Sequence, residues 1–134
     1  MSDPFVSDNT INAARMALNG LSLREEVIGR NVANVDTPGY QAQQVDFESA
    51  LGNAIGGGSS LKMAVTDPAH LLPQSQSTGA QVSARPGGSE RADGNDVDIQ
   101  VELAQMTETG VRYEALTDLL SKKLSLLKSI AGGG

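Results

Sequence analysis

The chain has 134 residues, which is room for one domain, and its composition limits what that domain can contain. It has two Phe, two Tyr and no Trp, so the side chains that usually dominate a core are nearly absent. A net charge of −6 disfavours binding to nucleic acid or to an anionic membrane surface. Without cysteine there is no disulfide, thiolate metal site or cysteine nucleophile, and without a long apolar run no segment is expected to cross a bilayer.

Residues 10–35 are predicted to form an amphipathic helix, because apolar residues recur every three or four positions along one face. Asp8 or Asn9 is a suitable N-cap. The sequence Asp36-Thr37-Pro38-Gly39 predicts the end of the helix, since Pro disfavours a helical residue before it and Gly tolerates a positive φ. The residues expected on the apolar face are Ile11, Ala14, Leu18, Leu21, Ile28, Val32 and Val35.

The central residues 41–95 give only weak structural signals. Residues 45–51 fit a short strand or a helical turn, 56–60 a flexible linker and 61–65 a short strand. Residues 73–95 have little to bury and are expected to be disordered. His70, the only histidine, has no partner at a recognisable catalytic or ligand spacing, so no catalytic residue, metal site or cofactor is predicted.

The C-terminal segment is predicted to form a longer helix that begins at Asn95 or Asp96 and ends at the final glycines. Its main apolar row alternates spacings of 4 and 3, which is typical of a coiled coil. That row consists of Ile99, Leu103, Met106, Gly110, Tyr113, Thr117, Leu120, Leu124, Leu127 and Ala131, and a second row of Leu116, Leu119, Leu126 and Ile130 widens it. Gly110 is either simply tolerated in the helix or marks the close approach of another backbone.

These patterns predict an all-α fold in which two long amphipathic helices pair as an antiparallel coiled-coil hairpin. The expected parts are 1–40, with the first helix and its turn, a flexible and mostly irregular central segment at 41–95, and the C-terminal helix at 96–134. A lone helix pair covers only part of such wide apolar stripes. The chain therefore either stays partly unfolded by itself or buries the stripes against other chains.

The most specific stretch is Asn31-Val32-Ala33-Asn34-Val35-Asp36-Thr37-Pro38-Gly39-Tyr40, with two asparagines about one helical turn apart before a rigid turn. It resembles the N-terminal signature of bacterial flagellar rod and hook proteins, which reads approximately N-[IVL]-A-N-x-x-T-P-G-[YF]. The segments 45–51, 66–71, 95–99, 102–106 and 112–116 are similar to the short proximal rod subunits of that family. The resemblance covers residues 5–130 and is weakest at 73–94.

The resemblance implies a structural subunit rather than an enzyme. Such subunits leave the cytoplasm through the flagellar type III secretion apparatus without a cleaved signal peptide. They polymerise helically into the axial rod of the basal body, in the periplasmic space. The implied partners are further copies of the chain, other rod subunits, the adaptor FliE and the export gate, with no nucleic acid and no direct membrane insertion. In the signature, Asn31 and Asn34 would satisfy backbone groups around the turn at Thr37, Pro38 and Gly39, and Tyr40 would seal it.

Within one subunit, the first helix is expected to pack through Ile11, Leu18, Leu21, Ile28 and Val32 against Leu103, Met106, Tyr113, Leu120, Leu124 and Leu127. The remaining apolar residues Leu116, Leu119, Leu126 and Ile130 are expected to face neighbouring subunits.

Phe47 and Leu51 have the Phe-x-x-x-apolar spacing associated with docking at the export switch protein, and packing against the rod is the rival explanation. A soluble coiled-coil adaptor or type III secretion chaperone is the alternative function. It would explain two helices and the acidity, but not the stretch from Asn31 to Tyr40.

Overall fold

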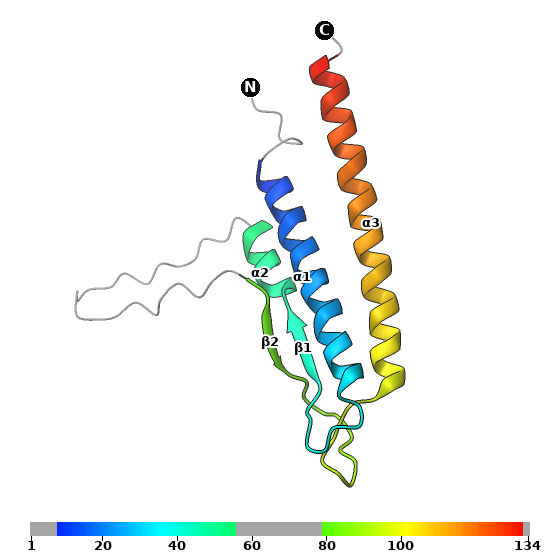
Figure 1. Ribbon diagram of the computed structural model, residues 1–134. Coiled ribbons are helices and arrows are strands. Elements are labelled where there is room, and N and C mark those ends of the chain that lie inside the picture. The colour runs from blue at the N-terminus through cyan, green and yellow to red at the C-terminus, as the bar shows by residue number, and fades with distance from the viewer. Residues whose placement is uncertain (1–7, 56–78, 133–134) are drawn as a thin grey trace, which may run out of the picture.

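Two long antiparallel helices form the body of the molecule, as the sequence predicts (Figure 1). The structure, a computed structural model, describes residues 8–55 and 79–132. Its elements are α1 (Asp8–Ala33), β1 (Gln43–Asp46), α2 (Glu48–Ile55), β2 (Gln81–Ala84) and α3 (Ile99–Gly132). At 1.5 Å per residue, α3 is about 51 Å long and α1 about 39 Å, so α3 extends past the N-terminal end of α1 (Figure 1). Neither of these two helices is apolar enough over its length to cross a bilayer.

Both long helices end where local side-chain chemistry dictates. After α1, the Tyr40 amide donates to the Thr37 carbonyl at 3.2 Å, and Gly39 adopts a φ of +74°. These are the features of a tight turn with Pro at its second position and Gly at its third. α3 begins after Asp98, whose carboxylate accepts from the Gln100 amide at 2.9 Å. Asp98 is therefore the N-cap, rather than the predicted Asn95 or Asp96.

The central segment contains more order than the sequence predicts. Residues 45–51, expected to form a short strand or a helical turn, hold the end of β1 and the start of α2. β1 pairs with β2 in antiparallel fashion, with Gln43 opposite Ala84 and Asp46 opposite Gln81. The expectation of disorder across residues 73–95 is wrong for 79–95, because this stretch is held by hydrogen bonds rather than by buried apolar side chains. The linker and strand predicted at 56–65, and His70, lie outside the described residues.

The largest apolar core lies on one side of α1, against β1 and the start of α2. It consists of Ala17, Leu21, Val27, Val45 and Phe47, with Leu23, Leu51, Ala80 and Leu116 packed around it. The Phe47 ring sits directly on Gly20, where an added Cβ would lie 2.2 Å from the ring's Cγ. The Arg24 guanidinium lies over the same ring, 4.7 Å from its centroid. Gly20 thus allows the only large buried aromatic side chain of the described residues to reach the helix surface.

Candidate functional site: the turn after α1 and the outer face of α3

Asn31, the first asparagine of the signature, is fully buried and has a partner for each polar atom. Its Nδ2 donates to the Gln43 carbonyl at 2.8 Å and to Glu102 Oε2 at 3.1 Å. Its Oδ1 accepts from the Tyr40 hydroxyl at 3.0 Å and from the Gln43 amide at 2.9 Å. One side chain on α1 therefore joins the turn, β1 and α3.

Glu102 is the second fully buried member of this group, on the inner face of α3. Its Oε1 accepts from Arg85 Nη1 at 2.6 Å, which makes a buried ion pair. Arg85 also donates from Nη2 to Gln105 Oε1 at 2.9 Å and from its backbone amide to the Ala42 carbonyl at 2.8 Å. We call Asn31, Tyr40, Arg85 and Glu102 the polar cluster. Of its members, Arg85 and Glu102 were not singled out from the sequence.

The second half of the signature binds the segment that precedes α3. Asn34 donates to the Arg30 carbonyl at 2.8 Å and accepts from the Thr37 hydroxyl at 3.1 Å. The buried Asn95 donates from Nδ2 to the carbonyls of Asn34 and Thr37, both at 2.8 Å. The Gly39 amide donates to the Asp93 carbonyl at 2.9 Å. The shape of the turn is thus held by backbone groups, whose hydrogen bonds are completed by the side chains of Asn34 and Asn95.

Burial raises the pKa of Tyr40 above its ordinary value of 10.0. The nearby Arg30 opposes this change in pKa, and the carboxylates of Glu102 and Asp96 reinforce it. The Tyr40 hydroxyl therefore keeps its proton at neutral pH and remains a donor to Asn31.

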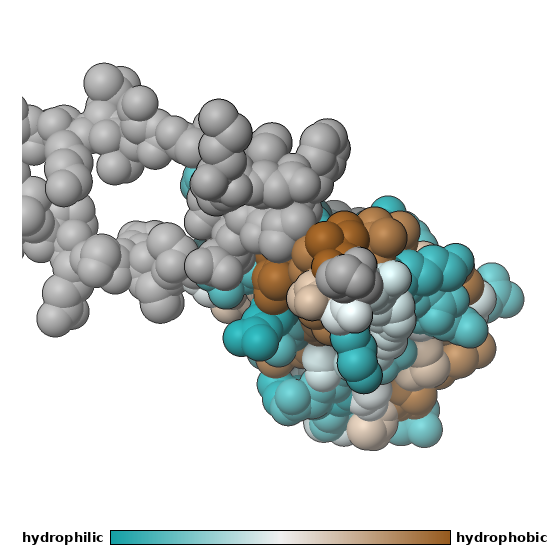
Figure 2. Space-filling view, turned by 90° about the horizontal axis from the view of Figure 1, so that it is seen from above, coloured by the Kyte–Doolittle hydropathy of each residue, from teal (hydrophilic) through white to brown (hydrophobic). Residues whose placement is uncertain are grey.

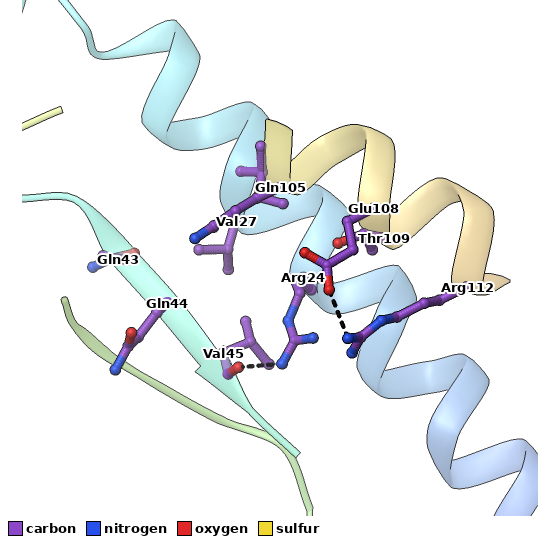
Figure 3. Close-up of a pocket in the computed structure, with 10 residues that line it drawn as sticks. Arg24, Val27, Gln43, Gln44, Val45, Gln105, Glu108, Thr109 and Arg112 are labelled. Carbon is purple, nitrogen blue, oxygen red and sulfur yellow. Dashed lines mark hydrogen bonds and ion pairs between the residues drawn. The ribbon is translucent and has the colours of Figure 1, made fainter. Parts of the chain in front are cut away.

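A small cleft of about 160 Å³ lies between α1, β1 and α3 (Figure 3). In Figure 3 the side chains of Arg24 and Arg112 reach toward it, and Arg112 pairs with Glu108 at 2.6 Å. Arg24 donates to the Val45 carbonyl at 2.8 Å and to the Glu48 carboxylate at 2.6 Å. Burial alone would raise the pKa of Glu48, but the hydrogen bond and charge of Arg24 outweigh it and lower that pKa.

The arginines around this cleft are thus already paired with acidic side chains. Within residues 8–55 and 79–132, no three His, Asp or Glu side chains converge as a metal site would require.

The inner face of α3 only partly matches the apolar row read from the sequence. Met106, Leu120 and Leu127 belong to both, whereas Leu103, Gly110, Thr117 and Leu124 are each replaced on the inner face by the residue before. Apart from Gln105 and Gly110, the residues of α3 that are at least half-buried repeat with heptad spacing: Glu102, Met106, Thr109, Leu116, Leu120, Lys123 and Leu127. On α1, Leu21 and Ile28 are buried, and Ile11, Leu18 and Val32 are half-buried. The structure does not bring Leu103, Tyr113 and Leu124 into the interior, since they are exposed in the single chain.

The residues assigned to subunit contacts are divided. Leu116 packs against the core of its own chain. Leu119, Leu126 and Ile130 are 65, 62 and 68 % exposed. At Gly110 no backbone comes close, because the nearest atom to an added Cβ is Glu25 Oε1 at 3.7 Å.

Of the export candidates, Phe47 is buried and Leu51 is half-buried at the edge of the core. Both therefore contribute to the folded structure, whatever else they do.

Comparison with known proteins finds relatives of both the signature and the chain as a whole. Residues 11–41, which cover most of α1 and the turn, fit the family model described as flagella basal body rod protein. The flagellar basal body rod protein FlgB of Bacillus subtilis is 30% identical over 125 residues, which are 93% of this chain and 95% of that protein. FlgB of Aeromonas hydrophila is 32% identical over 93% of this chain and 95% of its own length. FlgB of Escherichia coli K12 is 30% identical over 95% of this chain and 96% of its own length.

The similarity therefore runs through α1, the turn, the strand pair and α3, and is not confined to the signature. The chain belongs to the FlgB family of flagellar basal body rod proteins.

Proposed function

We propose that the chain is a structural subunit of the flagellar rod, which leaves the cytoplasm through the flagellar type III apparatus and polymerises helically into the drive shaft. The observation that carries this proposal is the near full-length relationship to FlgB proteins. That family is structural, so the chain's chemistry is that of packing and hydrogen bonding rather than catalysis.

The outer face of α3 supports assembly as the function. Its leucine and isoleucine side chains are exposed in one chain, and monomeric soluble proteins rarely leave such rows uncovered. A contact between two different surfaces of identical subunits produces an open helical array when it does not close into a ring. An array of this kind is the geometry that a shaft requires.

The proposal includes a position in the assembly. Since the resemblance is to proximal rod subunits, the chain would lie at the cell-proximal end of the rod in the periplasmic space. Its neighbours there would be other rod subunits, the adaptor FliE and the export gate. It would reach this place without a cleaved signal peptide.

Mass spectrometry of purified hook–basal bodies tests this function. The chain should be found there in low copy beside other rod proteins, and deletion of its gene should abolish swimming until the gene is restored. If intact basal bodies lack the chain while it accumulates in the cytoplasm, the alternative of a soluble adaptor or secretion chaperone is correct instead.

A second proposal concerns export: Phe47, with Leu51, is read by the secretion apparatus before the chain folds. Phe47 is buried in the folded chain, so it can be read only in the unfolded form. The matched pair is Phe47→Ala against Val45→Ala, because both residues lie in the same core but only Phe47 belongs to the Phe-x-x-x-apolar pattern. Secretion into the medium of a hook-deficient strain should fall several-fold for Phe47→Ala alone. Equal secretion of the two variants would leave core packing as the role of Phe47.

A further inference from the structure

Two rows on opposite sides of α3 have the same spacing. The outer ridge consists of Leu119, Leu126 and Ile130, and the notch row consists of Gly110, Thr117 and Ser121. In both rows the steps are seven and then four residues. At about 100° per residue, the rows lie roughly 180° apart around the helix, with the face toward α1 between them. Figure 2, which views the molecule from above, shows hydrophobic residues reaching the surface in separate patches with polar residues between them.

The notch row is shaped to receive large side chains. Gly110 has no side chain, and beside it only the Glu25 carboxylate comes within 4 Å of an added Cβ. The Thr117 hydroxyl donates to the Tyr113 carbonyl at 2.8 Å, so it is already satisfied within its own helix. Thr117 and Ser121 are exposed. Small residues at one row of a helix form the groove into which the ridge of another helix packs.

Apart from Arg112, the charges of α3 are segregated along its length. Glu108, Glu114 and Asp118 lie in its first two-thirds, and Lys122, Lys123 and Lys128 lie near its end. Two parallel copies side by side without an axial shift would place like charges together, which is unfavourable. A shift of nine residues, about 14 Å, places Glu114 of one copy level with Lys123 of the other.

The same shift places Leu119 level with Gly110, Leu126 with Thr117 and Ile130 with Ser121. We propose that a second copy of this chain docks on α3 in this way, parallel and displaced by about 14 Å toward the C-terminal end, so that its notch row receives the outer ridge. The inference rests on the proposed function, because it names the contact between like subunits within the rod. Since ridge and notch are different surfaces, every docked copy presents a free ridge to the next one.

Disulfide cross-linking tests this contact directly, because the natural chain has no cysteine. The double variant Thr117→Cys with Leu126→Cys, and independently Ser121→Cys with Ile130→Cys, should form ladders of dimers, trimers and longer species when basal bodies are oxidised. The matched control is Val111→Cys with Leu126→Cys, since Val111 is 62% exposed on α3 but belongs to neither row. Each variant is first shown to support swimming under reducing conditions.

Ladders from either test pair with monomer only from the control support the contact. Cross-linking no greater than the control overturns it, as do dimers from Leu126→Cys alone, which would mean that two ridges face each other. If the natural chain is present in basal bodies and no ladder forms, only this inference fails. If the chain is absent from basal bodies, the proposed function fails, and cross-linking of the purified full chain still reports on the contact.

Discussion

Replacement of Gly20 by alanine is expected to destabilise the fold although it adds only one methyl group. An added Cβ would lie 2.2 Å from Phe47 Cγ, and no rotation of a flexible chain end relieves the contact because the atom belongs to the ring itself. Loss of a buried phenyl ring costs about 3 to 5 kcal/mol, and the change from glycine to alanine in a helix returns about 1 kcal/mol. The expected net loss is therefore about 2 to 4 kcal/mol of unfolding free energy.

Gly29→Ala is the matched control, because Gly29 lies on the same helix and nothing comes within 4 Å of its added Cβ. It should gain about 1 kcal/mol from helix propensity alone. The assay is urea denaturation of the full chain followed by circular dichroism at 222 nm. A Gly20→Ala variant as stable as Gly29→Ala would refute the argument that the glycine is required by the ring.

Three further predictions concern polar residues and use the same assay. Asn31→Ala leaves the Gln43 backbone groups and the Glu102 carboxylate without a hydrogen-bond partner and should cost about 2 to 4 kcal/mol of unfolding free energy. Asn34→Ala, whose hydrogen bonds are exposed, should cost less than about 1 kcal/mol. Equal losses would contradict the central place of Asn31. Glu102→Ala leaves the largely buried Arg85 guanidinium without its carboxylate partner and should cost about 3 kcal/mol. Glu108→Ala, whose ion pair is exposed, should cost less than about 1 kcal/mol, and equal losses would contradict the argument. The fold lowers the pKa of Glu48 below its ordinary value of 4.5, so the stability that this carboxylate adds is present above pH 4.5 and is lost as the pH falls below it. Glu48→Gln should lack this loss of stability, which is under about 1 kcal/mol because the carboxylate is half exposed. A variant with the pH profile of the natural chain would refute the assignment.

The two long helices could be predicted from the sequence because their signals are local and periodic. The predicted start and end of the first helix differ from Asp8 and Ala33 by about two residues, the usual uncertainty of helix boundaries. For α3, the predicted caps Asn95 and Asp96 are wrong, because the choice of cap depends on contacts made elsewhere. Asn95 is occupied by the carbonyls of Asn34 and Thr37, which leaves Asp98 to cap the helix.

The strand pair and the polar cluster could not be predicted, because their reasons lie far apart in the sequence. β1 and β2 are four residues each. β1 is mostly polar and shows no alternation, and the polar–apolar alternation of β2 is too short to identify a strand by itself. One heptad position of the inner face is occupied by Glu102, Thr109, Leu116 and Lys123. Three of these four residues are polar, so a search for apolar repeats does not find this row. What makes that row favourable is the pairing of Glu102 with Arg85 and Asn31, which no local pattern reveals.

The polar cluster also fixes where α3 stands along α1. A heptad row of apolar side chains alone tolerates slippage by one repeat, about 10 Å, with little change in what is buried. Slippage here would bring Thr109 to Asn31 and leave the charges of Glu102 and Arg85 without each other, so only one axial register satisfies the buried groups. That register determines how far α3 projects beyond α1. It therefore also fixes the axial position of the outer ridge in each subunit. The polar cluster, at the turn end of the helix pair, thereby also sets the axial position of the surface through which a second copy would dock.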